Sequence, residues 1–144
     1  MPRDILAKLK EDTPAAWGMM TPQHMLEHLE MSYRIAAGQI QDFEIVTPLE
    51  YIEKVRETLW NYQPMPKNYG FPLLPKDKLA DLKHENLDTA KKQLLEARKA
   101  YLQFFRENPN ATTKNAVFGE PSKFEWELLE RKHINHHFEQ FGLW

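Results

Sequence analysis

Apolar residues recur with helical spacing in four segments of the chain. Side chains three and four positions apart share one face of a helix, and this pattern predicts helices over residues 21–38, 47–62, 88–107 and 122–141. A short helical turn is predicted before them, around Ile5 to Leu9. No segment keeps the alternation of apolar and polar residues that marks a strand. The predicted fold class is therefore all-α, as an antiparallel four-helix bundle.

Residues typical of helix ends support these boundaries. Thr21 and Thr47 are both followed by proline, which is favoured in the first turn of a helix. Ser122 is followed three residues later by Glu125, which is the pattern of a capping box. Gly38 is suited to end the first helix, because glycine readily adopts the left-handed conformation found there.

A long proline-rich segment separates the second and third predicted helices. Prolines at 64, 66, 72 and 75 exclude a regular helix from the segment between residues 64 and 87, so it is expected to be mostly irregular. Long loops in compact domains often serve a function. Two interpretations stay open: a crossover strap that packs its apolar side chains over one end of the bundle, or a lid over an active site.

Composition limits the classes of protein to which the chain can belong. At 144 residues it is expected to form a single domain, 1–144. The net charge is −2, with acids and bases interspersed and no basic stripe, so no nucleic-acid partner is expected. The first residues lack the apolar region of a signal peptide, and no apolar run is long enough to span a membrane. We therefore expect a cytoplasmic protein without a membrane partner.

The histidines carry the clearest chemical signal. The chain has no cysteine, so a metal site would depend on His, Asp or Glu. Two pairs of histidines, His24 with His28 and His133 with His137, are four residues apart, which places both rings of a pair on one helix face. His137 is preceded directly by His136.

Helical geometry separates the histidines that point inward from the others. With about 100° between successive residues, His133 and His137 fall on the inward arc of the last helix, and His136 falls at its rim. On the first helix, His28 lies nearer the centre of the apolar stripe than His24 does. A single inward histidine is usually an ordinary core residue, but three on one interior need partners for their ring nitrogens. His28, His133 and His137 are therefore the candidate metal ligands.

Three neutral imidazoles suit a divalent transition metal, with Zn²⁺ or Ni²⁺ expected first and Fe²⁺ also compatible. Three protein ligands leave a position for water, which is the usual arrangement of a catalytic rather than a structural zinc site. His24 is the alternative ligand, and as a fourth ligand it would close the site.

Two further polar residues of the last helix are candidate catalytic residues. Gln140 shares the inward arc and is expected either to hold a ligand or substrate or to be an ordinary residue at a helix end. Glu130 flanks the arc and is either a general base or a solvated glutamate. Glu130 and His133 also form the Glu-x-x-His unit of di-iron bundles, but the chain has no second unit, which argues against a di-iron site.

Segments at both ends of the chain resemble a known family. The segment from His133 to Gln140 reads HINHHFEQ and is similar to the HxxHHxxQ signature on the last helix of the DinB-like superfamily, which includes the YfiT-like proteins. Residues 21–29, TPQHMLEHL, resemble the first-helix pattern, in which a histidine before leucine is a ligand. Residues 118–126 resemble the approach to the last helix in one uncharacterised branch.

This resemblance implies a fold and a class of chemistry. It implies an up-up-down-down four-helix bundle, often a homodimer, with a metal on His28, His133 and His137 beside a cavity. Characterised members conjugate low-molecular-weight thiols, so the expected function is a metal-dependent transferase or hydrolase that activates a thiol or water for a small-molecule substrate. The alternative is a non-catalytic bundle that binds a metal or a small ligand.

Overall fold

The computed structural model describes residues 3–144. Over these residues the protein is helical throughout, with five α-helices and no strand. The helices are α1 (Arg3–Ala7), α2 (Pro22–Ala36), α3 (Ile52–Glu57), α4 (Leu87–Glu107) and α5 (Lys123–Gln140), and a 3-10 helix, η1 (Leu49–Tyr51), leads directly into α3. The prediction of an all-α protein is confirmed.

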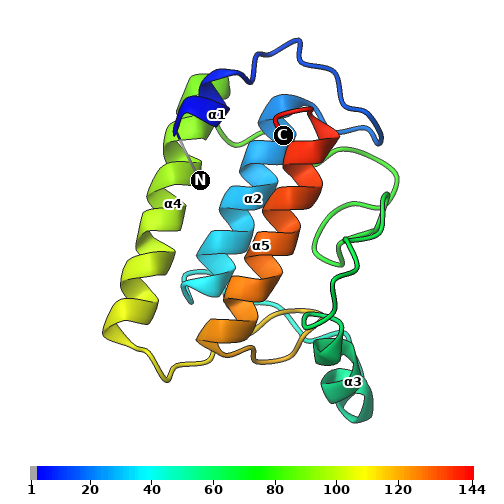
Figure 1. Ribbon diagram of the computed structural model, residues 1–144, viewed down its shortest axis with the longest axis vertical. Coiled ribbons are helices and arrows are strands. Elements are labelled where there is room, and N and C mark those ends of the chain that lie inside the picture. Colours follow the sequence, from blue (N-terminus) through cyan, green and yellow to red (C-terminus); the bar gives the residue numbers. More distant parts are fainter. Residues whose placement is uncertain (1–2) are drawn as a thin grey trace.

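Three long helices, α2, α4 and α5, form the body of the protein. They lie side by side, with α2 and α4 running in the same direction and α5 in the opposite one (Figure 1). Helix α2 packs against both of the others, so its inward residues are shielded on two sides. The core between the helices includes Met25, Leu29, Ala90, Leu94, Ala97, Trp126 and Phe138.

Side-chain caps set the ends of the long helices close to their predicted positions. The hydroxyl of Thr21 accepts a hydrogen bond from the backbone N–H of His24 at the start of α2. Ser122 and Glu125 form the predicted capping box at the start of α5, with each side chain accepting from the other's backbone. Asn86 caps α4 through Thr89, which sequence patterns had not indicated.

The second predicted helix, over residues 47–62, is much shorter in the structure. Thr47 makes no cap there, because its hydroxyl donates instead to the carbonyl oxygen of Val117 at 2.6 Å. After α3 ends, the Lys132 ammonium group of α5 binds the carbonyl oxygens of Thr58 and Gln63, which holds the chain in a non-helical path. Figure 1 shows α3 at one end of the molecule, apart from the three long helices.

The segment between α3 and α4 is irregular, as its prolines predicted. From Asn61 to Asn86 it contains no helix. Its middle part covers one side of α2 and α5, and Phe71 and Leu73 pack against the core. Residues 64–86 are here called the strap. None of the helices in the described part of the chain combines the length and the apolar character needed to cross a bilayer.

Candidate metal centre

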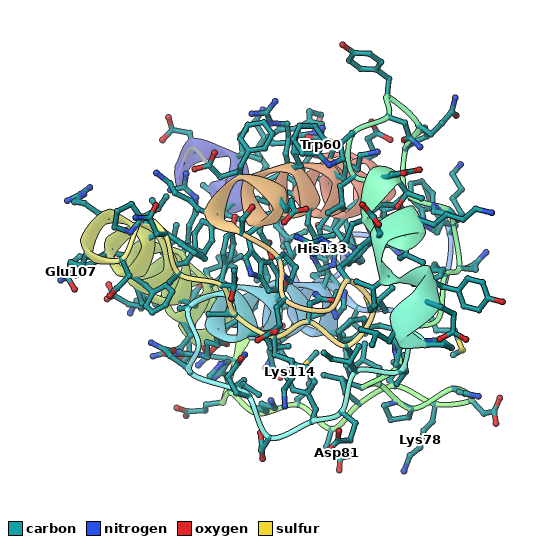
Figure 2. The ribbon with its side chains drawn as sticks, turned by 90° about the horizontal axis from the view of Figure 1, so that it is seen from below. Trp60, Lys78, Asp81, Glu107, Lys114 and His133 are labelled. Carbon is teal, nitrogen blue, oxygen red and sulfur yellow. The ribbon has the colours of Figure 1, made fainter. Side chains whose placement is uncertain are left out.

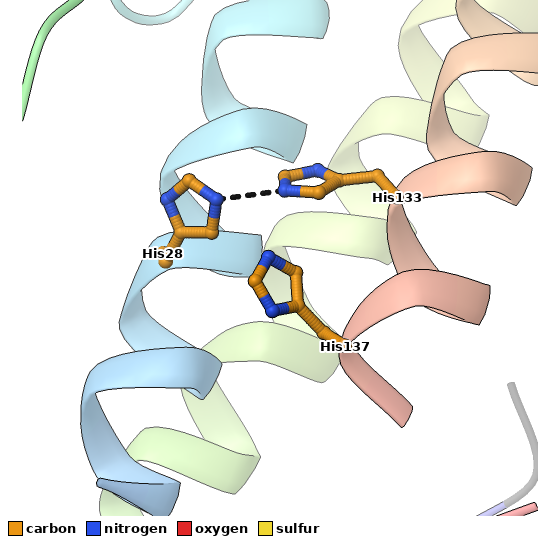
Figure 3. Close-up of side chains that lie close together, drawn as sticks. All are labelled: His28, His133 and His137. Atoms are coloured by element: carbon orange, nitrogen blue, oxygen red, sulfur yellow. Dashed lines mark hydrogen bonds between the residues drawn. The ribbon is translucent and has the colours of Figure 1, made fainter. Parts of the chain in front are cut away.

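Three histidines from two helices converge in the interior. His28 projects from α2, and His133 and His137 project from successive turns of α5 toward it (Figure 3). Each of the three offers a ring nitrogen, and these atoms all lie within 4.8 Å of one another. The view along the long helices places His133 in the interior, whereas Trp60 and Lys78 lie at the periphery (Figure 2). The structure therefore brings together the three histidines that the sequence singled out.

Two features of local structure produce this convergence. The spacing of four residues stacks His133 and His137 one turn apart on the same face of α5. The packing of α2 against α5 then brings the ring of His28 close to the other two. The distance between ring centres is 4.6 Å to His133 and 4.9 Å to His137. None of the three residues is more than 9% exposed.

A chain of hydrogen bonds fixes the orientation of His137. The side-chain amide nitrogen of Gln140 donates to the backbone oxygen of Trp17 at 2.8 Å, so its amide oxygen faces His137. That oxygen can only accept, so Nδ1 of His137, 2.8 Å away, must carry the proton. The other ring nitrogen, Nε2, is then left with a free lone pair. This is how residues behind a metal ligand usually select its tautomer.

The other two histidines are only partly satisfied by the protein. Their Nε2 atoms are 2.7 Å apart, so one ring donates a hydrogen bond to the other. Nδ1 of His28 is buried and finds no hydrogen-bond partner among the described residues. An unpaired polar atom in a protein interior costs about 1–3 kcal/mol. The protein therefore tolerates an incompletely paired group at this position.

The protonation state of the cluster suits metal binding. Burial lowers the pKa of His28 to about 3 and that of His137 to about 4, with smaller contributions from neighbouring histidines. Burial likewise holds the pKa of His133 well below its usual range. All three rings are therefore neutral at pH 7, which is the form that binds metals. Two nitrogens bonded to one ion at about 2.1 Å are at most about 4.2 Å apart, so the three histidines could hold one ion after small ring rotations.

His24 and His136 lie outside the cluster. His24 hydrogen-bonds the hydroxyl of Thr21 through Nδ1 and the backbone oxygen of Ala80 through Nε2, so both its nitrogens are used. His136 is half-buried, and its ring contacts the rings of Trp17 and His137 edge-on. Among residues 3–144, no fourth His, Asp or Glu joins the three-histidine group.

Glu130 is buried rather than solvated. Its Oε1 accepts a hydrogen bond from the Ser32 hydroxyl at 2.5 Å, and Oε2 has no partner within the described part of the chain. Burial raises the pKa of Glu130 to about 8, because a charged carboxylate is poorly solvated there. Glu130 lines neither of the cavities beside the histidines, whereas Ser32 lines one of them.

Two cavities meet at the histidine cluster. A strap-side cavity of about 300 Å³ lies between the strap and the start of α2, and an α3-side cavity of about 480 Å³ lies between α3, α5 and the strap. Both are lined by His28, His136 and His137, and His133 lines the α3-side cavity alone. Residues of the strap, including Phe71, wall both cavities, so the strap roofs the site. The ring of Phe71 packs edge-on against His28, with 5.9 Å between the ring centres, a contact that the sequence did not indicate.

Comparisons with protein-family models, with curated proteins and with solved structures gave no match for this chain. The similarity to the DinB-like superfamily therefore stays a prediction based on the two histidine-bearing segments.

Proposed function

We propose that the protein is a metal-dependent enzyme of DinB-like type, in which His28, His133 and His137 hold one divalent ion, Zn²⁺ or Ni²⁺. The reaction is the transfer or hydrolysis of a group on a small-molecule substrate, with a thiol or water as the nucleophile. The observation that carries the proposal is the convergence of three buried, neutral imidazoles at the wall of two cavities. In this proposal η1 and α3 form the shortened second helix of the bundle.

The donor set fits such an ion. Three imidazole nitrogens are common ligands of catalytic zinc, and the group leaves at least one coordination position for a substrate. When bound, the ion lowers the pKa of a thiol or water and so provides a nucleophile near neutral pH. Gln140 orients His137 through its hydrogen bond to Nδ1, and we assign it this positioning role. Residues of the strap wall both cavities beside the histidines.

The second candidate is a binding protein without catalytic activity. A binding protein would be favoured by a metal site with four protein ligands and no position for a substrate. His24 was the candidate for the fourth ligand, but both of its ring nitrogens are hydrogen-bonded to other groups. The two cavities beside the histidines instead provide room for substrates, which favours an enzyme. We assign Glu130 no direct role as a base, because it lines neither cavity and its raised pKa keeps it largely protonated at pH 7.

The resemblance also implies a homodimer. Large apolar side chains are exposed around α3 and the start of α5, and they are suited to such an interface: Leu49, Tyr51, Trp60 and Phe124. Light scattering after gel filtration will show whether the protein in solution has the mass of one chain or two.

The decisive experiment uses protein reconstituted with Zn²⁺ or Ni²⁺. Turnover is measured with low-molecular-weight thiols plus an electrophile, and separately with ester and amide substrates. We expect turnover that depends on metal and disappears in His137→Ala, while His24→Ala, the matched control on α2, retains it. Turnover that survives His137→Ala, or spectroscopic evidence for four protein ligands, would exclude the proposed metal chemistry.

A further inference from the structure

The α3-side cavity is walled mainly by apolar side chains. They come from five parts of the chain that meet beside the histidines, namely α2, α3 with the loop after it, the strap, the loop before α5 and the first half of α5. The wall includes Met31, Ile35, Val55, Leu59, Met65, Phe71, Val117, Phe118, Trp126 and Leu129. The volume of about 480 Å³ lies within the range of roughly 300–1,000 Å³ that is typical of small-molecule sites.

Lys132 is the single lysine, arginine, aspartate or glutamate among the described residues that line this cavity. Its ammonium group is already saturated, because it donates to the backbone oxygens of Thr58 and Gln63 and to Oδ1 of Asn61 at 2.8–3.1 Å. An ammonium group has three N–H donors, and all three are used. An anionic ligand would therefore find no free N–H donor on Lys132 in this cavity.

A cationic ligand would be equally unmatched, because no carboxylate lines the cavity within residues 3–144. The oxygens of Thr58, Asn61 and Gln63 already accept hydrogen bonds from the Lys132 ammonium group. Transferring a charge into an apolar site without a counter-charge is strongly unfavourable. The strap-side cavity differs in this respect, because charged side chains line it: Glu27, Lys76, Lys78, Asp81 and Lys83.

We propose that the α3-side cavity binds an uncharged, mainly apolar small molecule or substituent, whose reactive end lies at His28 and His133. The identification of this ligand as the substrate rests on the proposed function. The contrast between the cavities supports the proposal, since several charged side chains line the strap-side cavity while the surface of the α3-side cavity is mainly apolar and Lys132 is its one such group among the described residues. Besides the histidines and Lys132, the polar side chains on its wall are uncharged: Ser32, Thr58, Asn61, Gln63, Tyr69 and Asn115.

The test compares three probes that share one naphthalene ring: neutral 1-naphthylacetamide, anionic 1-naphthalenesulfonate and cationic 1-naphthylmethylammonium. Titration calorimetry is performed on the full chain, both metal-free and loaded with zinc. We expect the neutral probe to bind at least tenfold more tightly than either charged probe to the metal-free form, in which no metal charge contributes. Equal or tighter binding of a charged probe to that form would overturn the proposal.

Variants of Val55 on α3 locate the binding. Val55→Trp places an indole in the cavity, and we expect it to weaken binding of the neutral probe at least tenfold. Val46→Trp is the matched control, since Val46 is 56% exposed and lines neither cavity, and it should bind the probe unchanged. Val55→Asp supplies a counter-charge and should reduce the preference for the neutral over the cationic probe at least tenfold.

Unchanged binding in both Val55 variants would place the ligand elsewhere and refute the proposal. Circular dichroism shows whether each variant folds, and zinc stoichiometry is measured on all of them. If one of the two Val55 variants does not fold, the other is used to locate the binding. Wild-type protein that binds no zinc would refute the proposed function, whereas the preference for the neutral probe is judged independently on the metal-free form.

Discussion

Two clusters of polar side chains lie along α2 and are built in opposite ways. The first is the three-histidine cluster, His28, His133 and His137, which faces two cavities. The second, here called the anchor cluster, consists of Glu27 and Glu30 of α2 together with His84 of the strap. Both clusters join segments that are far apart in the sequence.

In the anchor cluster every carboxylate oxygen has a partner. Glu27 accepts hydrogen bonds from the backbone N–H groups of Lys83 and His84. Glu30 accepts from Arg34 through one oxygen and pairs with the ring of His84 through the other, at 2.7 and 2.5 Å. The carboxylate oxygens of the anchor cluster are all matched within the protein, so they need no further ligand.

The three-histidine cluster lacks such internal matching. Nδ1 of His28 has no partner in the described part of the chain, and two Nε2 atoms share a single hydrogen bond. Polar groups that a fold matches internally serve its structure, whereas buried polar groups left over beside a cavity indicate a ligand. This contrast predicts that substitutions in the two clusters will affect different properties.

The largest expected effect is on metal content. His133→Ala removes one of three ligands, so we expect bound metal to fall from about one ion per chain to less than about one tenth, as measured by inductively coupled plasma mass spectrometry. His84→Ala in the anchor cluster is the matched control and should keep the wild-type stoichiometry. Loss of metal in the control, or its retention in His133→Ala, would remove the distinction between the clusters.

Acid should destabilise the metal-free protein through the histidine cluster. The folded-state pKa of His28 is about 3 and that of His137 about 4, both below the unfolded value near 6.5. The unfolded chain therefore binds protons that the folded chain does not, and stability is lost as the pH falls below 6.5. We expect a loss of about 3–5 kcal/mol between pH 7 and pH 4, as measured by urea unfolding.

A variant that lacks His28 separates the contribution of this histidine from that of the acidic residues. The variant His28→Leu removes one of the depressed pKa values and should lose less stability over the same pH interval than the wild type. Equal losses in both proteins would show that carboxylates, and not this histidine, account for the acid sensitivity.

The anchor cluster should contribute stability rather than metal affinity. Glu30→Ala removes the buried partner of both Arg34 and His84, and breaking such a pair costs about 2–4 kcal/mol. Thermal or urea unfolding of the metal-free protein measures the change, and Glu96→Ala, an exposed position on α4, is the control. Metal stoichiometry should stay unchanged in Glu30→Ala, and its loss would contradict the assignment of separate roles.

Sequence reasoning predicted the long helices and the convergence of the histidines from short-range regularities. Helical spacing placed His133 and His137 on one face, and capping residues set the ends of α2 and α5. The second helix was predicted too long, because Thr47 and Lys132 bind backbone oxygens distant in sequence. Such long-range contacts leave no periodic signal.

The same limit applies to the polar residues around the site. Glu130 was a candidate base or a solvated residue, and only the fold shows that it is buried against Ser32, nearly one hundred positions away. The anchor cluster was likewise invisible in the sequence, since His84 lies in an irregular segment and its partner Glu30 reads as an ordinary helix residue.

The smallest expected effect again differs between the two clusters. In the metal-free protein, His28→Leu replaces a buried ring with an unpaired Nδ1 by an apolar side chain of similar size. The loss of this unsatisfied group is stabilising, but Nε2 of His133 loses its hydrogen-bond partner, so we expect the two effects to offset and the change to stay below about 1 kcal/mol by urea unfolding at pH 7. His84→Leu should destabilise the protein by more, because it leaves Glu30 without a partner on one oxygen and removes no unsatisfied group in return. A destabilisation of His28→Leu as large as that of His84→Leu would mean that packing or internal hydrogen bonds already satisfy the His28 ring, and the argument that the cluster is built for a ligand would then fail.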